Sequence, residues 1–351
     1  MSKLNKNIEN ILKNLVRNYM KGSLAFSIEP EDAELMSWTH QKTFLDATIH
    51  SELLKDFPVK NEFAKLFFKK LISSIEPHQE VHDDIYNFLC LAMENTSTDA
   101  FCYRHYIIDD DIDDTRNIIT IKETNNMVVN GTTGMRTWEA ALMLADWALC
   151  SKDMFLNKKI LELGSGVGFT GITIAKHCNI QSIVLSDCHH DVLKTIKENI
   201  NINFPDLNDE KTIYRVPDSE NVLMLDWNDD DEIQEELVPD IVIGADIVYD
   251  PSILQLLCNV LLRFFDKNDR LEVYIASMIR NEETFNEFLK TLGKVTIFFI
   301  ENIRSSLLVK VIAYIQELCI LKIPLRLKWD SSVHKIWLKK FPFSACLLSI
   351  S

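Results

Sequence analysis

The segment Ile160–Gly171 has the sequence ILELGSGVGFTG and gives the clearest indication of the fold. An apolar run as long as a buried strand leads directly into glycines, and an apolar helical pattern starts right after them. The chain has 351 residues and only nine glycines, four of which lie between Gly164 and Gly171. Glycine lets a ligand approach the backbone closely and opens the N-terminus of a helix toward it. The segment therefore predicts a ligand-binding turn between a strand and a helix.

Strands and helices alternate on both sides of this turn, from Thr137 to about Ile300. Helices are expected at 138–150, 170–178, 191–203, 253–265 and 282–292, and strands at 159–163, 182–187, 240–246 and 271–277. Such alternation predicts an α/β fold with a mainly parallel, doubly wound sheet. In sheets of this kind, ligands bind outside the carboxyl ends of the strands.

The regions before and after this alternation have different patterns. Residues 1–100 predict a helical domain, because apolar positions from Leu4 to Tyr19 and from Phe63 to Leu71 fall on helical faces. Residues 103–108 and 117–122 predict a hairpin at the start of the main domain, which we expect to span 101–300. Residues 301–351 hold eight Lys or Arg against three Asp or Glu, in a chain of net charge −15. We expect this end to be an atypical basic tail.

Composition narrows the class of protein. A net charge of −15 and a pI near 5.1 argue against a general nucleic-acid binder held by phosphate contacts. The eight cysteines contain no C-x-x-C pair, which favours reduced thiols in a cytoplasmic protein over a disulfide framework or a zinc site. The sequence starting at Met1 has no apolar signal segment, and no uninterrupted apolar run is long enough to cross a membrane.

Two clusters of possible metal ligands have simpler explanations. Cys188, His189, His190 and Asp191 follow a predicted strand and begin a helix, so capping and packing account for them. The acidic run 109–114 lacks the glycine and the spaced acids of a calcium loop, so a solvated turn is favoured. We therefore expect no metal.

Three positions indicate the ligand of the glycine turn. Glu162 would repel a pyrophosphate but suits the ammonium group of a methionine moiety. Asp187 ends the next strand, where it can accept hydrogen bonds from both hydroxyls of a ribose, as in NAD enzymes. Trp227, next to Asp226, can stack on an adenine or shape a slot for it. Together these residues predict a cleft for S-adenosyl-L-methionine. An NAD(P)-dependent oxidoreductase is the alternative, and Glu162 and the Asp226-Trp227 pair argue against it.

The chain resembles the class I methyltransferases, which have a Rossmann-like sheet of seven strands, and within them methyltransferase family 16, the lysine methyltransferases. The motifs that carry the resemblance are GTTGMRTW at 131–138, LELGSGVG at 161–168, SDCH at 186–189, LDW at 225–227 and ADIVY at 245–249. It extends to FPVKNEFAKLF at 57–67, which is similar to the family members that methylate a lysine of eukaryotic translation elongation factor 2. The resemblance covers roughly residues 50–293, and the sequence after about Lys294 departs from the family pattern.

The resemblance implies a protein-lysine N-methyltransferase whose N-terminal helices dock the protein substrate. It also implies cofactor contacts at Trp138, Gly164, Ser165, Gly166, Asp187, Trp227 and Ala245, beside the Glu162 considered above. Asp246 and Tyr249 match the family's D-x-x-Y motif beside the target lysine. Asp246 would position the amine first and accept its proton second, and Tyr249 would hydrogen-bond the amine or pack against its methyl groups. Two other interpretations stay open: a methyltransferase for another protein or a small molecule, and a binding protein inactivated by its divergent tail.

Overall fold

The computed structural model describes residues 3–94, 100–108, 117–205, 222–229, 233–302, 308–315 and 348–349. Contacts divide the chain into two compact units, Met1–Asn125 and Asn126–Ser351. The predicted hairpin belongs to the first unit, whereas the boundary expected at residue 100 assigned it to the second. Ile107 and Ile118 of the hairpin join the apolar core of the helices, which is the physical reason for this grouping. The acidic run 109–114 and most of the basic tail lie outside the described residues.

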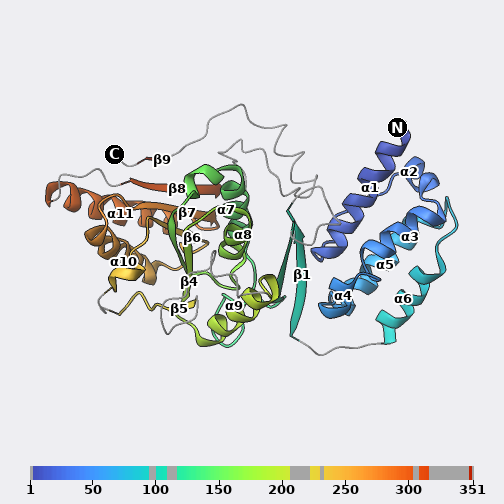
Figure 1. Ribbon diagram of the computed structural model, residues 1–351, viewed down its shortest axis with the longest axis horizontal. Coiled ribbons are helices and arrows are strands. Elements are labelled where there is room, and N and C mark those ends of the chain that lie inside the picture. The colour runs from blue at the N-terminus through green and yellow to red at the C-terminus, as the bar shows by residue number, and fades with distance from the viewer. Residues whose placement is uncertain are drawn as a thin grey trace. The chain divides into compact units, whose positions relative to one another are not determined.

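The first unit consists of helices followed by one hairpin (Figure 1). Its helices are α1 (Lys3–Met20), α2 (Pro30–Leu35), α3 (Trp38–Ala47), α4 (Glu52–Asp56), α5 (Asn61–Ile75) and α6 (Asp83–Glu94). The hairpin pairs β1 (Phe101–Ile107) with β2 (Ile118–Thr124) in antiparallel register. Because these helices are amphipathic, they bury their apolar faces against one another.

Aromatic side chains fill the centre of the first unit. Tyr19 of α1 lies edge-on to Phe44 of α3 and to Phe67 of α5, with ring centroids 5.9 and 5.0 Å apart. All three side chains are buried, and edge-to-face pairs of this kind add to the stabilisation that burial provides. Burial also raises the pKa of Tyr19 well above its usual value.

The second unit is built on a sheet with the strand order β5-β4-β3-β6-β7-β8-β9. Its strands are β3 (Lys159–Leu163), β4 (Ser182–Asp187), β5 (Val222–Met224), β6 (Ile241–Ala245), β7 (Glu272–Ile279), β8 (Leu308–Ile315) and β9 (Leu348–Ser349). The five neighbouring strands β5, β4, β3, β6 and β7 are all parallel. This arrangement confirms the predicted class I methyltransferase fold class. In the tail, β8 continues the sheet parallel to β7, and β9 pairs with β8 antiparallel.

Helices cover both faces of this sheet. They are α7 (Glu139–Cys150), α8 (Phe169–His177), α9 (His190–Asn203), α10 (Leu254–Lys267) and α11 (Glu282–Asn302). Leu161 and Leu163 of β3 share an apolar cluster with α10 and α11. Because side chains alternate along a strand, Glu162 between them faces the opposite side, where α8 lies. In the described part of the chain, no helix is long and apolar enough to cross a membrane.

Candidate functional site

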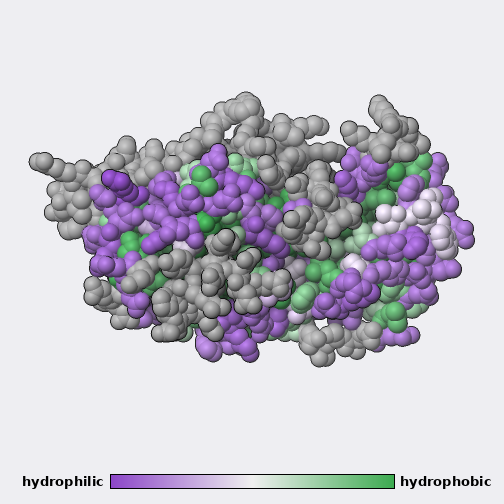
Figure 2. Space-filling view, in the orientation of Figure 1, coloured by the Kyte–Doolittle hydropathy of each residue, from purple (hydrophilic) through white to green (hydrophobic). Residues whose placement is uncertain are grey.

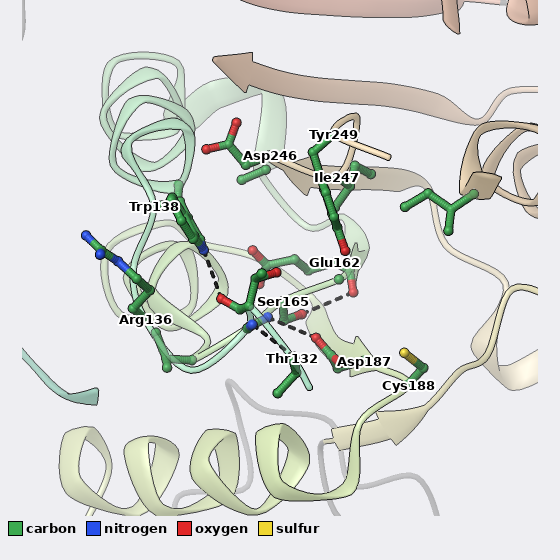
Figure 3. Close-up of a pocket in the computed structure, with 18 of the residues that line it drawn as sticks. Thr132, Arg136, Trp138, Glu162, Ser165, Asp187, Cys188, Asp246, Ile247 and Tyr249 are labelled. Carbon is green, nitrogen blue, oxygen red and sulfur yellow. Dashed lines mark hydrogen bonds between the residues drawn. The ribbon is translucent and has the colours of Figure 1, made fainter. Parts of the chain in front are cut away.

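A cavity of about 200 Å³ opens in the second unit at the carboxyl ends of β3, β4 and β6 (Figure 3). That volume suits a ligand of many atoms, since on the same scale a single water needs about 10–15 Å³. All ten residues selected from the sequence line it: Trp138, Glu162, Gly164, Ser165, Gly166, Asp187, Trp227, Ala245, Asp246 and Tyr249. Parallel strands bring their carboxyl ends to one edge, so residues far apart in the chain share this space.

The glycine turn forms one side of the cavity with bare backbone. Gly164 and Gly166 have φ angles of 59° and 54°, in the left-handed region that other residues rarely adopt. A Cβ atom on Gly164 would lie 2.8 Å from Cγ2 of Ile247, and one on Gly166 would lie 3.0 Å from the carbonyl oxygen of Gly134. Side chains at these two positions would therefore push on the cavity wall.

The Ser165 hydroxyl links this turn to two strands through hydrogen bonds. It donates to the carbonyl oxygen of Glu162 over 3.2 Å, and it accepts a hydrogen bond from the backbone N–H of Ser186 over 3.0 Å. The turn therefore bridges the end of β3 and the end of β4, which fixes the backbone that lines the cavity.

Glu162 brings a buried carboxyl group to the same place. The residue is 2% exposed, and its Oε2 atom accepts a hydrogen bond from the N–H of Gly171 over 3.0 Å. Gly171 lies in the first turn of α8, where helix N–H groups have no partner within the helix. Burial raises the pKa of Glu162 to about 8. A cation in the cavity would favour the ionised form of this carboxyl.

Asp187 ends β4 with its carboxylate held by backbone donors. Oδ1 accepts from the N–H of His189 over 3.0 Å, and Oδ2 accepts from the N–H of Gly166 over 3.3 Å. Burial raises the pKa of Asp187. A carboxylate has about four lone-pair sites, so these two bonds leave capacity for hydroxyl donors of a ligand.

The residues after Asp187 contact the loop before α7. Nε2 of His189 lies 3.2 Å from the carbonyl oxygen of Asn130, and Nδ2 of Asn130 donates to Asp191 over 2.9 Å. Within the described residues, no three His, Cys, Asp or Glu side chains are grouped as metal ligands. These contacts hold the loop before α7 against the start of α9.

Asp246 follows β6 in an unusual backbone conformation, with a φ angle of 54°. Oδ1 accepts a hydrogen bond from the N–H of Met278 over 2.8 Å, and Oδ2 pairs with Arg280 over 3.1 Å. The Asp246 side chain is only 6% exposed. Strained backbone of this kind persists where surrounding contacts hold it, and it is common at functional sites.

Two aromatic residues lie on the cavity wall near these acids. Trp138 donates from Nε1 to the carbonyl oxygen of Thr133 over 2.9 Å, and the guanidinium carbons of Arg136 and Arg280 lie 4.8 and 5.0 Å from its ring centroid. Tyr249 is more than half exposed, and its partial burial raises the pKa of its phenol. Figure 3 shows both rings directed toward the space that Glu162 also borders.

The comparison with known proteins decides the family. Residues 115–295 match the family described as lysine methyltransferase. The chain belongs to this lysine methyltransferase family. It is 32% identical over 272 residues to human protein-lysine N-methyltransferase EEF2KMT, covering 76% of this chain and 79% of that protein.

Two further relatives of this methyltransferase have names of the same kind. The mouse protein-lysine N-methyltransferase EEF2KMT is 34% identical over 245 residues, which are 68% of this chain and 71% of the mouse protein. Protein-lysine N-methyltransferase EFM3 of Saccharomyces cerevisiae is 28% identical over 249 residues, which are 66% of this chain and 68% of the yeast protein. The predicted family and the predicted class of enzyme, a methyltransferase, are therefore confirmed.

The structure brings to the site two arginines of this methyltransferase that were not among the residues expected from the sequence. Arg136 lines the cavity, and Arg280 contacts Asp246, which is 34 positions earlier in the chain. One signal could have identified Arg280, because it directly follows β7 and the carboxyl ends of parallel strands share one edge. Arg136 lies inside the GTTGMRTW motif, but no pattern singled it out.

Proposed function

We propose that this methyltransferase transfers a methyl group from S-adenosyl-L-methionine to the ε-amine of a lysine in eukaryotic translation elongation factor 2. The observation that carries the proposal is the gathering of all ten selected residues around one cavity. The substrate rests on the likeness of segment 57–67 to the enzymes that act on this factor, and on the name of the human relative. A cytoplasmic location stays a prediction that fits such a substrate.

The donor groups of the cavity fit this cofactor. Gly164 and Gly166 leave bare backbone that a Cβ atom would obstruct, which suits close approach of the methionine part. Glu162 would face its ammonium group, and Asp187 has free lone pairs for the ribose hydroxyls. Trp227 and Ile247 add apolar surface for the adenine end. When bound, S-adenosyl-L-methionine supplies an electrophilic methyl group on a sulfonium.

Asp246 and Tyr249 would receive the lysine. A lysine amine has an ordinary pKa near 10.4, so it must lose its proton before it can attack. Asp246 accepts hydrogen bonds at both oxygens from the protein, which makes it a fixed acceptor that orients the amine. The phenol of Tyr249 would hold the amine from the other side of the approach. Positioning of reacting groups can supply about 7–11 kcal/mol of a barrier.

The first unit would dock the protein substrate. Several large apolar side chains are exposed on it, among them Leu66 of α5 and Leu91 of α6 at 53% and 50%. In Figure 2, hydrophobic residues reach the surface of this unit among hydrophilic ones. Protein-binding surfaces bury exposed apolar side chains, so these two are candidates for contact with the substrate.

Calorimetric titration of the full chain with S-adenosyl-L-methionine and with NAD⁺ tests the cofactor. We expect binding of the first and none of the second, and a loss of affinity of about tenfold or more in Asp187→Asn, because one charged hydrogen-bond acceptor is lost. Binding of NAD⁺ alone would contradict the proposal and favour an oxidoreductase.

A further inference from the structure

Arg280 contacts three residues, two of which, Asp246 and Trp138, line the cavity. Its Nη2 atom lies 3.1 Å from Oδ2 of Asp246 and 3.0 Å from Oε2 of Glu139, the first residue of α7. Its guanidinium carbon lies 5.0 Å from the centroid of the Trp138 ring. One cation therefore connects the carboxylate that would receive the lysine to an aromatic wall of the cavity.

The two carboxylates that Arg280 contacts have different surroundings. The side chain of Asp246 is 6% exposed, while those of Arg280 and Glu139 are 47% and 53% exposed. Water therefore screens the contact to Glu139, whereas Asp246 depends on its protein partners. Among the described residues, Arg280 is the one basic side chain that forms an ion pair with Asp246.

That pairing bears on how an amine could react beside Asp246. A buried carboxylate with no counter-charge favours the ammonium form of a neighbouring lysine, and an ammonium has no lone pair for attack. A guanidinium stays charged at any pH at which the enzyme works and offers a flat fork that holds a carboxylate in one orientation. Arg280 thus supplies both a counter-charge and a fixed direction for Oδ2.

We propose that Arg280 is a positioning residue that holds the Asp246 carboxylate and balances its charge, so that a lysine hydrogen-bonded to that carboxylate can lose its proton to solvent water before it attacks. The inference rests on the proposed function, since it takes Asp246 as the acceptor for the target amine. It assigns Arg280 no contact with the reacting atoms.

Other charged or titratable groups border the same space and belong in any test of charge. Six line the cavity, from the loop before α7 and the ends of β3, β4, β5 and β6: Arg136, Glu162, Asp187, Cys188, Asp226 and Tyr249. Glu139, at the start of α7, contacts Arg280 itself. All of them stay unchanged when Arg280 alone is substituted, so differences between Arg280 variants report on its own charge.

Binding of two cofactor forms gives a readout that needs no protein substrate. S-adenosyl-L-methionine carries a sulfonium charge, and S-adenosylhomocysteine is the neutral thioether. We expect Arg280→Gln to shift the ratio of the two dissociation constants severalfold in favour of the sulfonium, because Asp246 then lacks its counter-charge. Arg280→Lys keeps the charge and should stay near the wild-type ratio. In an Asp246→Asn background, Arg280→Gln should change the ratio little.

The pH profile of methyl transfer to elongation factor 2 provides the second readout. In Arg280→Gln, the pH at which kcat reaches half its plateau should rise by about one unit, which is about tenfold less transfer at neutral pH. Arg280→Lys should recover most of this shift, which a loss of structure would not allow.

An unchanged ratio together with an unchanged pH profile in Arg280→Gln would overturn the inference. If the wild type binds both cofactor forms but leaves elongation factor 2 unmodified, the proposed substrate is wrong and the binding ratio alone decides on Arg280. If the wild type binds neither form, the proposed function and this inference fall together.

Discussion

The carboxyl group of Glu162 accepts a hydrogen bond from the backbone N–H of Gly171 over 3.0 Å. This contact ties the end of β3 to the first turn of α8. It also leaves no room for a side chain at Gly171, where a Cβ atom would lie 2.6 Å from Oε2 of Glu162. The acid that sequence analysis assigned to a cofactor ammonium therefore also stabilises the helix that follows the glycine turn.

Substitution of Glu162 by glutamine should flatten the pH dependence of stability. Burial raises the pKa of Glu162 from its ordinary value of 4.5 to about 8. Between these values the folded state binds more protons than the unfolded state, so the free energy of unfolding falls as pH rises. The glutamine amide does not titrate. Between pH 5 and 8.5 the free energy of unfolding should therefore fall more in the wild type than in Glu162→Gln, by on the order of a few kcal/mol. If calorimetry gave the same pH dependence of the free energy of unfolding for the wild type and for Glu162→Gln, the prediction would be wrong.

A methyl group on Gly166 should impair cofactor binding. Gly166→Ala places a Cβ atom 3.0 Å from the carbonyl oxygen of Gly134, at the cavity wall. Gly131→Ala is the matched control, since Gly131 also has a left-handed φ angle, of 82°, but its Cβ would meet nothing within 4 Å. Both variants should lose about 1–2 kcal/mol of stability. Only Gly166→Ala should weaken binding of S-adenosyl-L-methionine, by at least about tenfold. Equal affinities in calorimetry would show that the turn does not form part of the cofactor site.

The first unit should lose stability in mild acid through His105. This imidazole is fully buried between the Thr120 hydroxyl, 3.0 Å from Nδ1, and the carbonyl oxygen of Phe57, 2.9 Å from Nε2. Burial lowers the pKa of His105 to about 4. Below an unfolded pKa near 6.5 the unfolded state binds more protons, so stability is lost as pH falls toward 4. Urea unfolding followed by circular dichroism should give about 2 kcal/mol less stability at pH 5 than at pH 7.5 from this residue.

His105→Gln is the comparison that isolates this effect. Glutamine can keep a hydrogen bond to the Phe57 carbonyl, and it does not titrate. The variant should be less stable than the wild type at pH 7.5, because one buried contact is altered, but the gap should narrow at pH 5. A gap that stays constant would mean that His105 is protonated as readily when folded as when unfolded.

Charges on the exposed face of α5 and α6 should weaken docking of the protein substrate. Leu66→Glu and Leu91→Glu should raise KM for elongation factor 2 severalfold, with kcat and the affinity for S-adenosyl-L-methionine unchanged, because neither residue belongs to the cavity lining. Leu156→Glu is the matched control, at 51% exposure in the second unit. An equal rise of KM in all three variants would indicate a general charge effect, and no rise at all would remove the first unit from docking.

Much of the second unit could be predicted from local pattern. The bounds expected for 159–163 and 182–187 are those of β3 and β4, because a short apolar run that ends in glycine or an acid marks both ends of a buried strand. The sequence could also predict which acidic residues lie together in the site. Once the strands are known to be parallel, Glu162, Asp187 and Asp246 must lie at the same edge.

Contacts between side chains from distant segments could not be predicted in this way. The pairing of Asp246 with Arg280 and the bond from Gly171 to Glu162 depend on rotamers and on the packing of α8 against the sheet. The grouping of the β1–β2 hairpin with the N-terminal helices depends on the burial of Ile107 and Ile118 in their core. Periodicity describes one element at a time, so it carries no information on which core an isolated hairpin joins.

The most direct test of the account measures methyl transfer from radiolabelled S-adenosyl-L-methionine to unmethylated elongation factor 2, with the wild-type chain beside Asp246→Asn. Asparagine can keep the hydrogen bond from the Met278 N–H, so the fold and the cofactor site should persist. We predict label on the factor with the wild type, and at least about 100-fold slower transfer with Asp246→Asn, whose cofactor affinity should stay within severalfold of the wild type. No label from a wild-type chain that binds the cofactor, or equal label from the variant, would contradict the account.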